Sequence, residues 1–160
     1  MDRKLFFLIF NFTSENKYLS NSAVFISNFS SKIFIMIYAI TSLYTAYFIP
    51  DKLVLFLIVP FSLLVLNKIL RKIIKRVRPA DAFDLSLPVE RSLEFSFPSN
   101  HATSSMIIAL AILFLNLHFG IIMIFMSILT SVSRIMTGLH YPFDVIFGWI
   151  LALTFGIAFL

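Results

Sequence analysis

Long apolar runs, separated by short polar breaks, dominate the chain. They cover residues 33–49, 53–66, 100–117, 121–136 and 145–160. A helix needs about 20 residues to cross the hydrocarbon core of a bilayer, and a lipid-embedded backbone must pair its polar groups internally. The second run reaches this length only if the basic residues that follow it extend their side chains to the interface. The pattern predicts an all-α fold, a polytopic membrane helix bundle with about five transmembrane helices.

The first 30 residues alternate apolar and polar positions too often to span a membrane. We expect one or two interfacial helices in residues 1–30, lying on the membrane surface. The apolar run at 5–10 is short, and no small-residue cleavage site follows it, so we interpret it as retained rather than as a signal peptide. The simplest organisation is one integral-membrane domain over residues 1–160, with its candidate chemistry in residues 53–160.

Composition supports a membrane protein and excludes several kinds of site. The chain is 59% hydrophobic and 13% charged, whereas soluble domains are closer to half apolar and a quarter charged. It contains no cysteine, which excludes disulfides, thiolate nucleophiles and cysteine metal sites. The net charge of +5 comes largely from residues 68–78, next to an apolar run. This position favours an anionic lipid head group over nucleic acid as the partner.

The order of the crossings places three polar clusters on one membrane face. The end of the second span, the start of the third, and the junction between the fourth and fifth are all separated by an even number of crossings. Ionisable residues at a membrane boundary are costly and usually functional. We therefore expect the three clusters to converge, with His118 on the opposite face.

The first cluster is basic and follows the second apolar run. On a helix with 100° per residue, four of its cations fall within about 80° of one another. This predicted stripe consists of Lys68, Arg71, Lys75 and Arg78. Lys72 and Arg76 point away from Arg78. Such a stripe suits a phosphate, because arginine can bind two oxygens at once. A topology anchor on the positive side of the membrane is the alternative.

The second cluster opens the third span with the sequence Pro98-Ser99-Asn100-His101. We expect a helix to start here with Ser99 near its N-cap. The backbone N–H groups of Asn100 and His101 would then be unpaired and available to an anion. His101 would be placed to protonate a leaving oxygen. A capped helix with an interfacial histidine is the alternative.

The third cluster joins the fourth and fifth spans. His140 and Asp144 are four residues apart, so the carboxylate can orient the imidazole and leave the other ring nitrogen as a nucleophile. Gly138 and Pro142 permit a sharp reversal that brings Arg134 back toward His140. A pairing of His140 with Asp144 for stability alone is the alternative.

Taken together, the clusters resemble the phosphatidic acid phosphatase type 2 superfamily, which also includes vanadium haloperoxidases. The family motifs are Lys-x6-Arg-Pro, Pro-Ser-Gly-His and Ser-Arg-x5-His-x3-Asp. Their counterparts here are Arg71-x6-Arg78-Pro79, Pro98-Ser99-Asn100-His101 and Ser133-Arg134-x5-His140-x3-Asp144. The third motif matches at every defined position. Asn100 replaces a glycine and Arg71 replaces a lysine, so Lys72 or Lys75 could share the work of that lysine. Family members commonly have six spans, one more than the five predicted here.

The resemblance implies hydrolysis of a phosphate ester or diphosphate in two steps, without a metal ion or cofactor. His140 would attack phosphorus, Asp144 would orient it, and His101 would protonate the leaving oxygen. The implied phosphate-binding residues are Arg71, Arg78, Ser99, Asn100, Ser133 and Arg134, with Lys72 and Lys75 as possible auxiliaries.

The resemblance also implies a phosphorylated membrane lipid as substrate. Small family members with a Phe-Pro-Ser-Asn/Asp-His-Ala stretch often resemble the undecaprenyl diphosphatase branch. Phosphatidate, phosphatidylglycerol phosphate and lipid A 1-phosphate are alternative substrates, and the polar loop at 78–98 would choose among them. The expected location is the bacterial inner membrane, with the site facing outward as in the family. The positive-inside rule would place the basic cluster in the cytoplasm instead.

Two further hypotheses stay open at this point. The chain could be a non-catalytic membrane protein whose cations only hold anionic lipid. A metal site made of His101, His140 and Asp144 has suitable ligand types, but the surrounding cations would repel a divalent ion.

Overall fold

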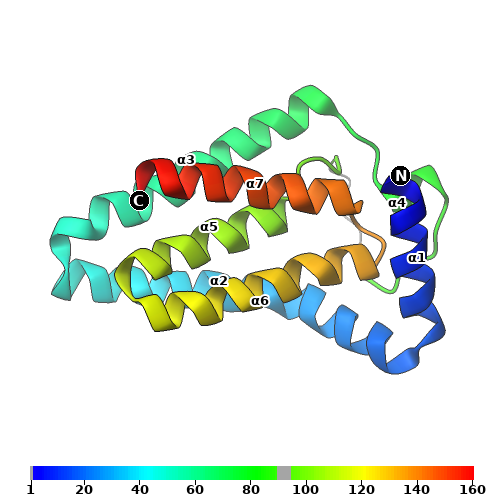
Figure 1. Ribbon diagram of the computed structural model, residues 1–160, viewed down its shortest axis with the longest axis horizontal. Coiled ribbons are helices and arrows are strands. Elements are labelled where there is room, and N and C mark those ends of the chain that lie inside the picture. The colour runs from blue at the N-terminus through cyan, green and yellow to red at the C-terminus, as the bar shows by residue number, and fades with distance from the viewer. Residues whose placement is uncertain (1, 90–94) are drawn as a thin grey trace.

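The computed structural model describes residues 2–89 and 95–160, and every regular element within these ranges is a helix. The elements are α1 (Asp2–Glu15), α2 (Lys17–Phe48), α3 (Pro50–Ile74), α4 (Pro79–Ala82), α5 (Asn100–Leu115), α6 (Leu117–Met136) and α7 (Pro142–Phe159). The long helices form an elongated bundle, and α1 lies across one of its ends (Figure 1). The predicted all-α bundle is confirmed.

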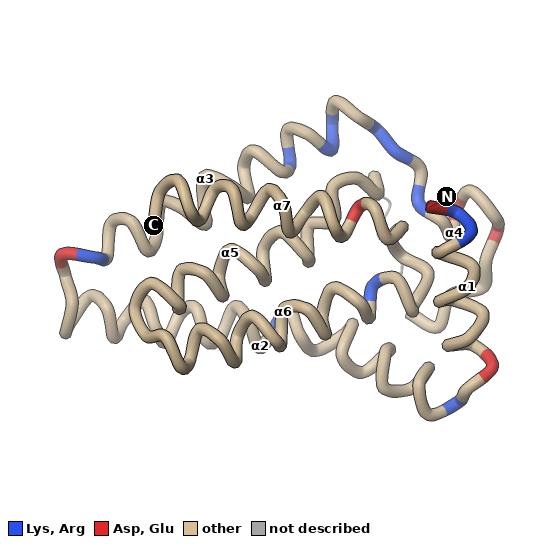
Figure 2. Tube along the Cα trace, viewed as in Figure 1, with Lys and Arg blue, Asp and Glu red and all other residues tan. Residues whose placement is uncertain are grey.

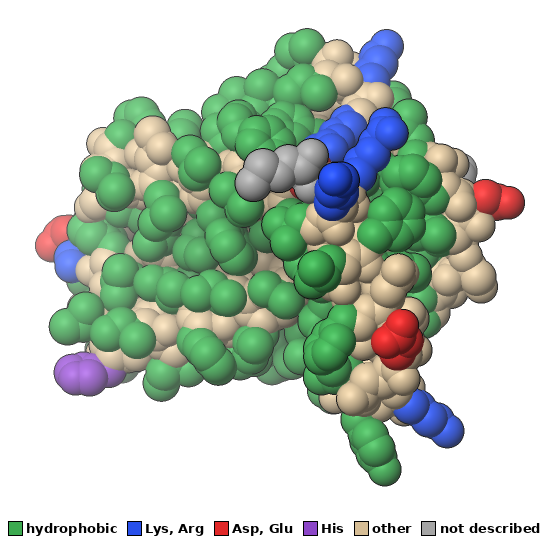
Figure 3. All heavy atoms as spheres, turned by 45° about the vertical axis from the view of Figure 1, so that its right-hand side comes forward, with side chains coloured by type: hydrophobic (Ala, Val, Ile, Leu, Met, Phe, Trp, Pro, Cys, Tyr) green, Lys and Arg blue, Asp and Glu red, His purple; other side chains and the backbone are tan. Residues whose placement is uncertain are grey.

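Within residues 2–89 and 95–160, four helices are long and apolar enough to cross a membrane: α2, α3, α6 and α7. The predicted third span is α5, which has only 16 residues and contacts all four of them. Because its neighbours surround it, α5 does not have to present a full membrane-spanning length to lipid. Hydrophobic side chains cover the flanks of the bundle, while charged ones gather toward its ends (Figure 3). This distribution is that of a multi-pass membrane protein.

The N-terminal third differs from the sequence-based expectation. Helix α2 is continuous, so the second interfacial helix and the first span are one element. Helix α1 does not lie by itself on the membrane surface, because its aromatic side packs against one end of the bundle. The Phe6 ring is fully buried and lies 5.6 Å from the Tyr141 ring, and the Phe7 and Phe83 rings are 4.8 Å apart. Burial of aromatic area fixes α1 to the bundle.

The connection between α5 and α6 is tighter than the predicted turn at 116–120. Only Asn116 is non-helical, and its side chain accepts a hydrogen bond from the Phe119 N–H at 2.9 Å. Gly120 makes this hairpin possible, since a Cβ there would lie 2.2 Å from the Leu113 Cα. Below the hairpin, Met123 packs into a buried cluster with residues of α2, α3 and α5. The pair α5 and α6 is therefore held in close contact.

We expect Gly120→Ala to destabilise the bundle. The new methyl group would meet the backbone of Leu113, which cannot rotate away, and such overpacking costs about 1–3 kcal/mol. The measurement is the melting temperature of the detergent-solubilised protein. Gly156→Ala is the matched control, because its Cβ would meet the movable Cδ1 end of Leu110 at 2.8 Å. Equal melting temperatures for the two variants would contradict the role of Gly120.

Candidate active site

The three polar clusters meet at the end of the bundle next to α1. The end of α3, the start of α5 and the α6–α7 loop all lie there (Figure 1), and so do most of the Lys and Arg positions (Figure 2). The count of crossings predicts this arrangement. His118 is exposed near the start of α6, at the opposite end of that helix from the cluster.

The α6–α7 loop places His140 by a sharp reversal of the backbone. Gly138 has φ +80°, a conformation that L side chains rarely adopt. The N–H groups of Leu139 and His140 both donate to the Arg134 carbonyl, at 3.0 and 3.2 Å. Helix α7 then begins at Pro142, which suits the first helical position. The expected return of the chain toward Arg134 is therefore present.

His140 and Asp144 are both fully buried and face each other. The distance from His140 Nδ1 to Asp144 Oδ2 is 3.6 Å, which is longer than a hydrogen bond. The Ser96 hydroxyl bridges this gap, because it donates to Asp144 Oδ2 and lies 3.5 Å from His140 Nδ1. Sequence reasoning missed Ser96, whose only signal was its position two residues before the Pro98 motif. Ser96, His140 and Asp144 therefore form one connected group.

The second ring nitrogen of His140, like Arg134 Nε, is a buried nitrogen of the site that lacks a partner among the described residues. His140 Nε2 is buried and has no hydrogen-bond partner within the described part of the chain. A buried polar nitrogen without a partner costs free energy unless a ligand satisfies it. Burial lowers the pKa of His140 to about 4, although Asp144 opposes this shift. The imidazole is therefore neutral at neutral pH, with a lone pair available on one nitrogen.

Three buried arginines surround the histidines, and each is held by a backbone carbonyl. Arg71 donates to the Phe95 carbonyl and Arg78 to the Leu139 carbonyl at 3.5 Å. Arg134 donates to the carbonyl and the hydroxyl of one residue of α2, Ser27, at 3.1 and 2.6 Å. The charges of all three act on the His101 imidazole. These contacts fix the positions of the three guanidinium groups.

The prediction that the four cations form a stripe on one helix is wrong. Helix α3 ends at Ile74, and Lys75 adopts the left-handed conformation with φ 51°. Arg78 is extended, as expected for the residue before a proline. The chain turns between Arg71 and Arg78, so these two become buried while Lys68 and Lys75 remain exposed.

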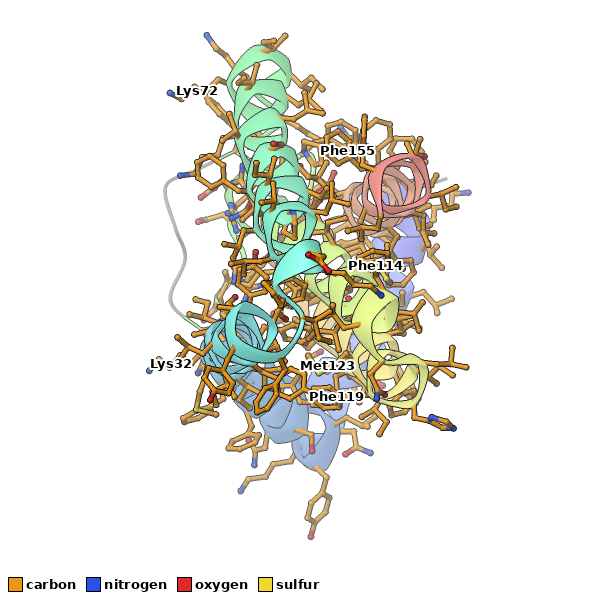
Figure 4. The ribbon with its side chains drawn as sticks, turned by 90° about the vertical axis from the view of Figure 1, so that its left-hand side faces the viewer. Lys32, Lys72, Phe114, Phe119, Met123 and Phe155 are labelled. Atoms are coloured by element: carbon orange, nitrogen blue, oxygen red, sulfur yellow. The ribbon has the colours of Figure 1, made fainter. Side chains whose placement is uncertain are left out.

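Two other predictions about this segment need correction. Lys72 is exposed and points away from the bundle (Figure 4), so neither it nor Lys75 lies with the buried arginines. The helical projection directed Arg76 away from Arg78 and gave it no role, yet its guanidinium binds Asp144 Oδ1 at 2.5 Å. The projection failed because residues 75–78 are not helical.

The start of α5 has the expected cap. Ser99 is the N-cap, and its hydroxyl accepts a hydrogen bond from the Ala102 N–H at 3.5 Å. The Ser99 N–H donates to the Asp144 carbonyl at 3.0 Å, which joins α5 to α7. The Asn100 side chain is held by Asn67 at 3.2 Å. The first backbone N–H groups of α5, which have no partner within the helix, are thus directed to the site end.

Ser133, which the resemblance places on the phosphate, is buried in α6. Its hydroxyl donates to the Thr130 carbonyl at 2.7 Å. The hydroxyl proton is therefore used inside the helix, and only the oxygen lone pairs remain for another contact.

Residues 51–160 match the PAP2 superfamily. This chain belongs to that family. A curated relative, undecaprenyl-diphosphatase BcrC of Bacillus subtilis (strain 168), is 33% identical over 96 residues, which are 60% of this chain and 50% of the relative. The chain thus matches about half the length of that relative.

Two solved structures have the same fold as this chain. LpxE of Aquifex aeolicus has a TM-score of 0.78 at 24% identity, over 97% of this chain and 92% of that one. A transmembrane PAP2-type phosphatidylglycerolphosphate phosphatase from Bacillus subtilis has a TM-score of 0.75 at 26% identity, over 98% and 83%. The PAP2 fold therefore includes the N-terminal helices, which the family match at 51–160 does not reach.

A cavity of about 270 Å³ with both polar and apolar lining lies next to His101. His101 and Asn100 line one part of it, and Phe34, Ile35 and Leu64 line another. A phosphate at the histidines would therefore have apolar surface from α2 and α3 next to it. Such a cavity suits a ligand with a charged head and an apolar chain.

We expect the His140 ring to stay neutral at pH values where an ordinary histidine is protonated. Its pKa of about 4 lies below the usual 6.5, so the proton binds only in strong acid. The measurement is ¹⁵N NMR of histidine-labelled protein in detergent, with the resonance assigned through His140→Asn. The His140 signals should keep their neutral shifts from pH 7.5 down to about 5.5. Titration near pH 6.5 would contradict the burial argument.

Proposed function

We propose that this PAP2 protein hydrolyses the phosphate or diphosphate head group of a membrane lipid through a phosphohistidine on His140. The observation that carries the proposal is the buried, unpartnered Nε2 of a neutral imidazole. Arg78 and Arg134 both act electrostatically on this ring. A neutral nucleophile beside fixed cations is the combination that attack on a phosphate dianion requires.

In the first step, His140 Nε2 forms a bond to phosphorus as the bond from phosphorus to the leaving oxygen breaks. His101, which takes up a proton as the negatively charged phosphate binds, gives that proton to the leaving oxygen, so the lipid leaves as a neutral alcohol or a phosphate. Asp144 and Ser96 face Nδ1 and hold its proton while positive charge develops on the ring. The imidazole is thereby oriented before the substrate arrives.

In the second step, water attacks the phosphohistidine and the phosphorus–nitrogen bond breaks. His101 accepts the water proton, which restores both histidines and releases inorganic phosphate. Throughout, Arg71, Arg78 and Arg134 and the first amides of α5 bind the phosphoryl oxygens. Ser99, Asn100 and Ser133 complete the proposed phosphate-binding set, with no metal ion or cofactor.

Undecaprenyl diphosphate is the substrate that we propose first. The similarity to undecaprenyl-diphosphatase BcrC supports it, and the apolar side chains of Phe34, Ile35 and Leu64 in the cavity beside His101 support a lipid. Phosphatidylglycerol phosphate, phosphatidate and lipid A 1-phosphate are the alternatives. We propose that the site faces the extracytoplasmic side of the inner membrane. The predicted substrate-choosing loop at 78–98 falls partly on residues 90–94, which lie outside the described residues.

His140→Asn should lower the rate of phosphate release from lipid about 1000-fold or more, since no nucleophile remains. The substitution keeps a buried polar side chain, and retention of the fold is checked by size-exclusion chromatography and melting temperature. His118→Asn is the matched control, because His118 is exposed at the other end of α6. A folded His140→Asn protein with wild-type turnover would leave a non-catalytic, anionic-lipid-binding protein as the better description.

A substrate panel tests the specificity and the absence of a metal requirement. The purified protein is given a C55 diphosphate, phosphatidylglycerol phosphate, phosphatidate and lipid A, each with and without excess EDTA. We expect the highest kcat/KM for the C55 diphosphate and no loss of activity in EDTA. A preference for another lipid would overturn the substrate assignment, and loss of activity restored by a divalent ion would overturn the metal-free mechanism.

A further inference from the structure

Arg76 makes contacts that link the catalytic carboxylate to two other segments. Its Nη1 binds Asp144 Oδ1 at 2.5 Å, and its Nη2 binds Asp2 Oδ2 at 2.6 Å. The guanidinium also lies over the Tyr141 ring, 4.1 Å from the centroid. A planar fork with several donors can hold two carboxylates at once, which a lysine cannot do with the same geometry.

The backbone of Arg76 takes part in the same arrangement. Its carbonyl accepts a hydrogen bond from the Ser96 N–H at 2.7 Å. The Ser96 hydroxyl in turn donates to Asp144 Oδ2, the oxygen that faces His140. Arg76 thus holds one carboxylate oxygen directly and places the residue that holds the other. Contacts to both carboxylate oxygens therefore fix the orientation of Asp144.

Asp2 fixes the outer end of this contact. Its Oδ2 binds Arg76, and its Oδ1 accepts a hydrogen bond from the Phe143 N–H at 3.0 Å, at the start of α7. The Asp2 and Arg76 side chains are 26% and 28% exposed, while Asp144 is fully buried. The buried aromatic contacts of Phe6 hold α1 against the same loop. Helix α1 is therefore joined to the site by charge and by packing.

A buried carboxylate that lost its cation would be destabilised by several kcal/mol and would reorient or take up a proton. In either case the carboxylate would orient the imidazole less well. We propose that Arg76 and Asp2 are positioning residues, which hold Asp144 and Ser96 where they orient His140 for attack. This inference rests on the proposed function of His140 as the nucleophile.

The test compares steady-state kinetics of Arg76→Gln, Arg76→Lys, Asp2→Asn and the double variant Arg76→Gln/Asp2→Asn. Arg76→Gln should lower kcat about 100-fold with KM nearly unchanged, since a misplacement of about 1 Å has this effect on turnover. Arg76→Lys should recover about a tenth of wild-type kcat, because it returns the charge without the fork. Asp2→Asn should lower kcat about fivefold alone and add nothing in the double variant.

Lys4→Gln and Glu15→Gln are the matched controls, since each removes one exposed charge from α1. Both should keep wild-type kinetics. A folded Arg76→Gln protein with kcat near wild type would overturn the proposal, and so would a loss confined to KM. A full Asp2→Asn effect in the double variant would show that Asp2 does not act through Arg76. If Arg76→Gln fails to fold, Arg76→Lys and Asp2→Asn carry the same comparison.

An NMR measurement distinguishes a failure of the positioning proposal from a failure of the proposed phosphatase function. The ¹⁵N resonances of His140 report which ring nitrogen carries the proton, and they need no substrate. They should shift in Arg76→Gln and stay unchanged in Lys4→Gln. An inactive wild-type protein with this pattern would contradict the phosphatase assignment alone. Unchanged His140 resonances in Arg76→Gln would contradict the positioning role, whatever the activity.

Discussion

The buried carboxylate of Asp144 is the group on which the rest of the site depends. It accepts hydrogen bonds from the Arg76 guanidinium, the Ser96 hydroxyl and the Tyr141 N–H, and it faces His140. A charge without exposure to water needs such partners, because desolvation costs several kcal/mol. These donors come from the segments after α3, before α5 and before α7. Satisfying one carboxylate therefore brings three distant parts of the chain together.

The buried arginines of the site are also held in place by hydrogen bonds. Arg71, Arg78 and Arg134 each bind a backbone carbonyl, so the positions of their charges are set before a ligand arrives. Preorganised charge stabilises a transition state without the cost of reorganising at the moment of reaction. The partner of Arg134 is Ser27 of α2. The N-terminal third of the chain therefore takes part in building the site.

The short central helix α5 connects the site with the membrane. Its start carries His101 and the Ser99 cap, and its body is surrounded by the helices that face lipid. The cavity beside His101 has an apolar wall formed by α2 and α3. A head group at the histidines and an apolar chain next to them would thus occupy adjoining surfaces. The helix that is too short to span by itself is the one that carries His101 to the site.

The sequence by itself determined the fold class, the family, the common face of the three motifs and the cap at Ser99. The family follows from the resemblance of the three motifs. The other features follow from apolar run lengths, the parity of crossings and local rules of helix termini, which need no knowledge of packing. It did not place Arg76 or Ser96 with Asp144, and it left the N-terminal helix on the membrane surface. Such contacts join residues 48 or more positions apart, as the pairs with Asp144 are.

Only the tertiary structure decided which cations are buried. A helical projection is valid while the helix lasts, and the left-handed Lys75 ended it before Arg76 and Arg78. Beyond that point the direction of each side chain depends on where the buried carboxylate and the neighbouring carbonyls lie. A buried charge is stable only next to its hydrogen-bonding and ionic partners, and the packing of the whole bundle determines where those partners lie.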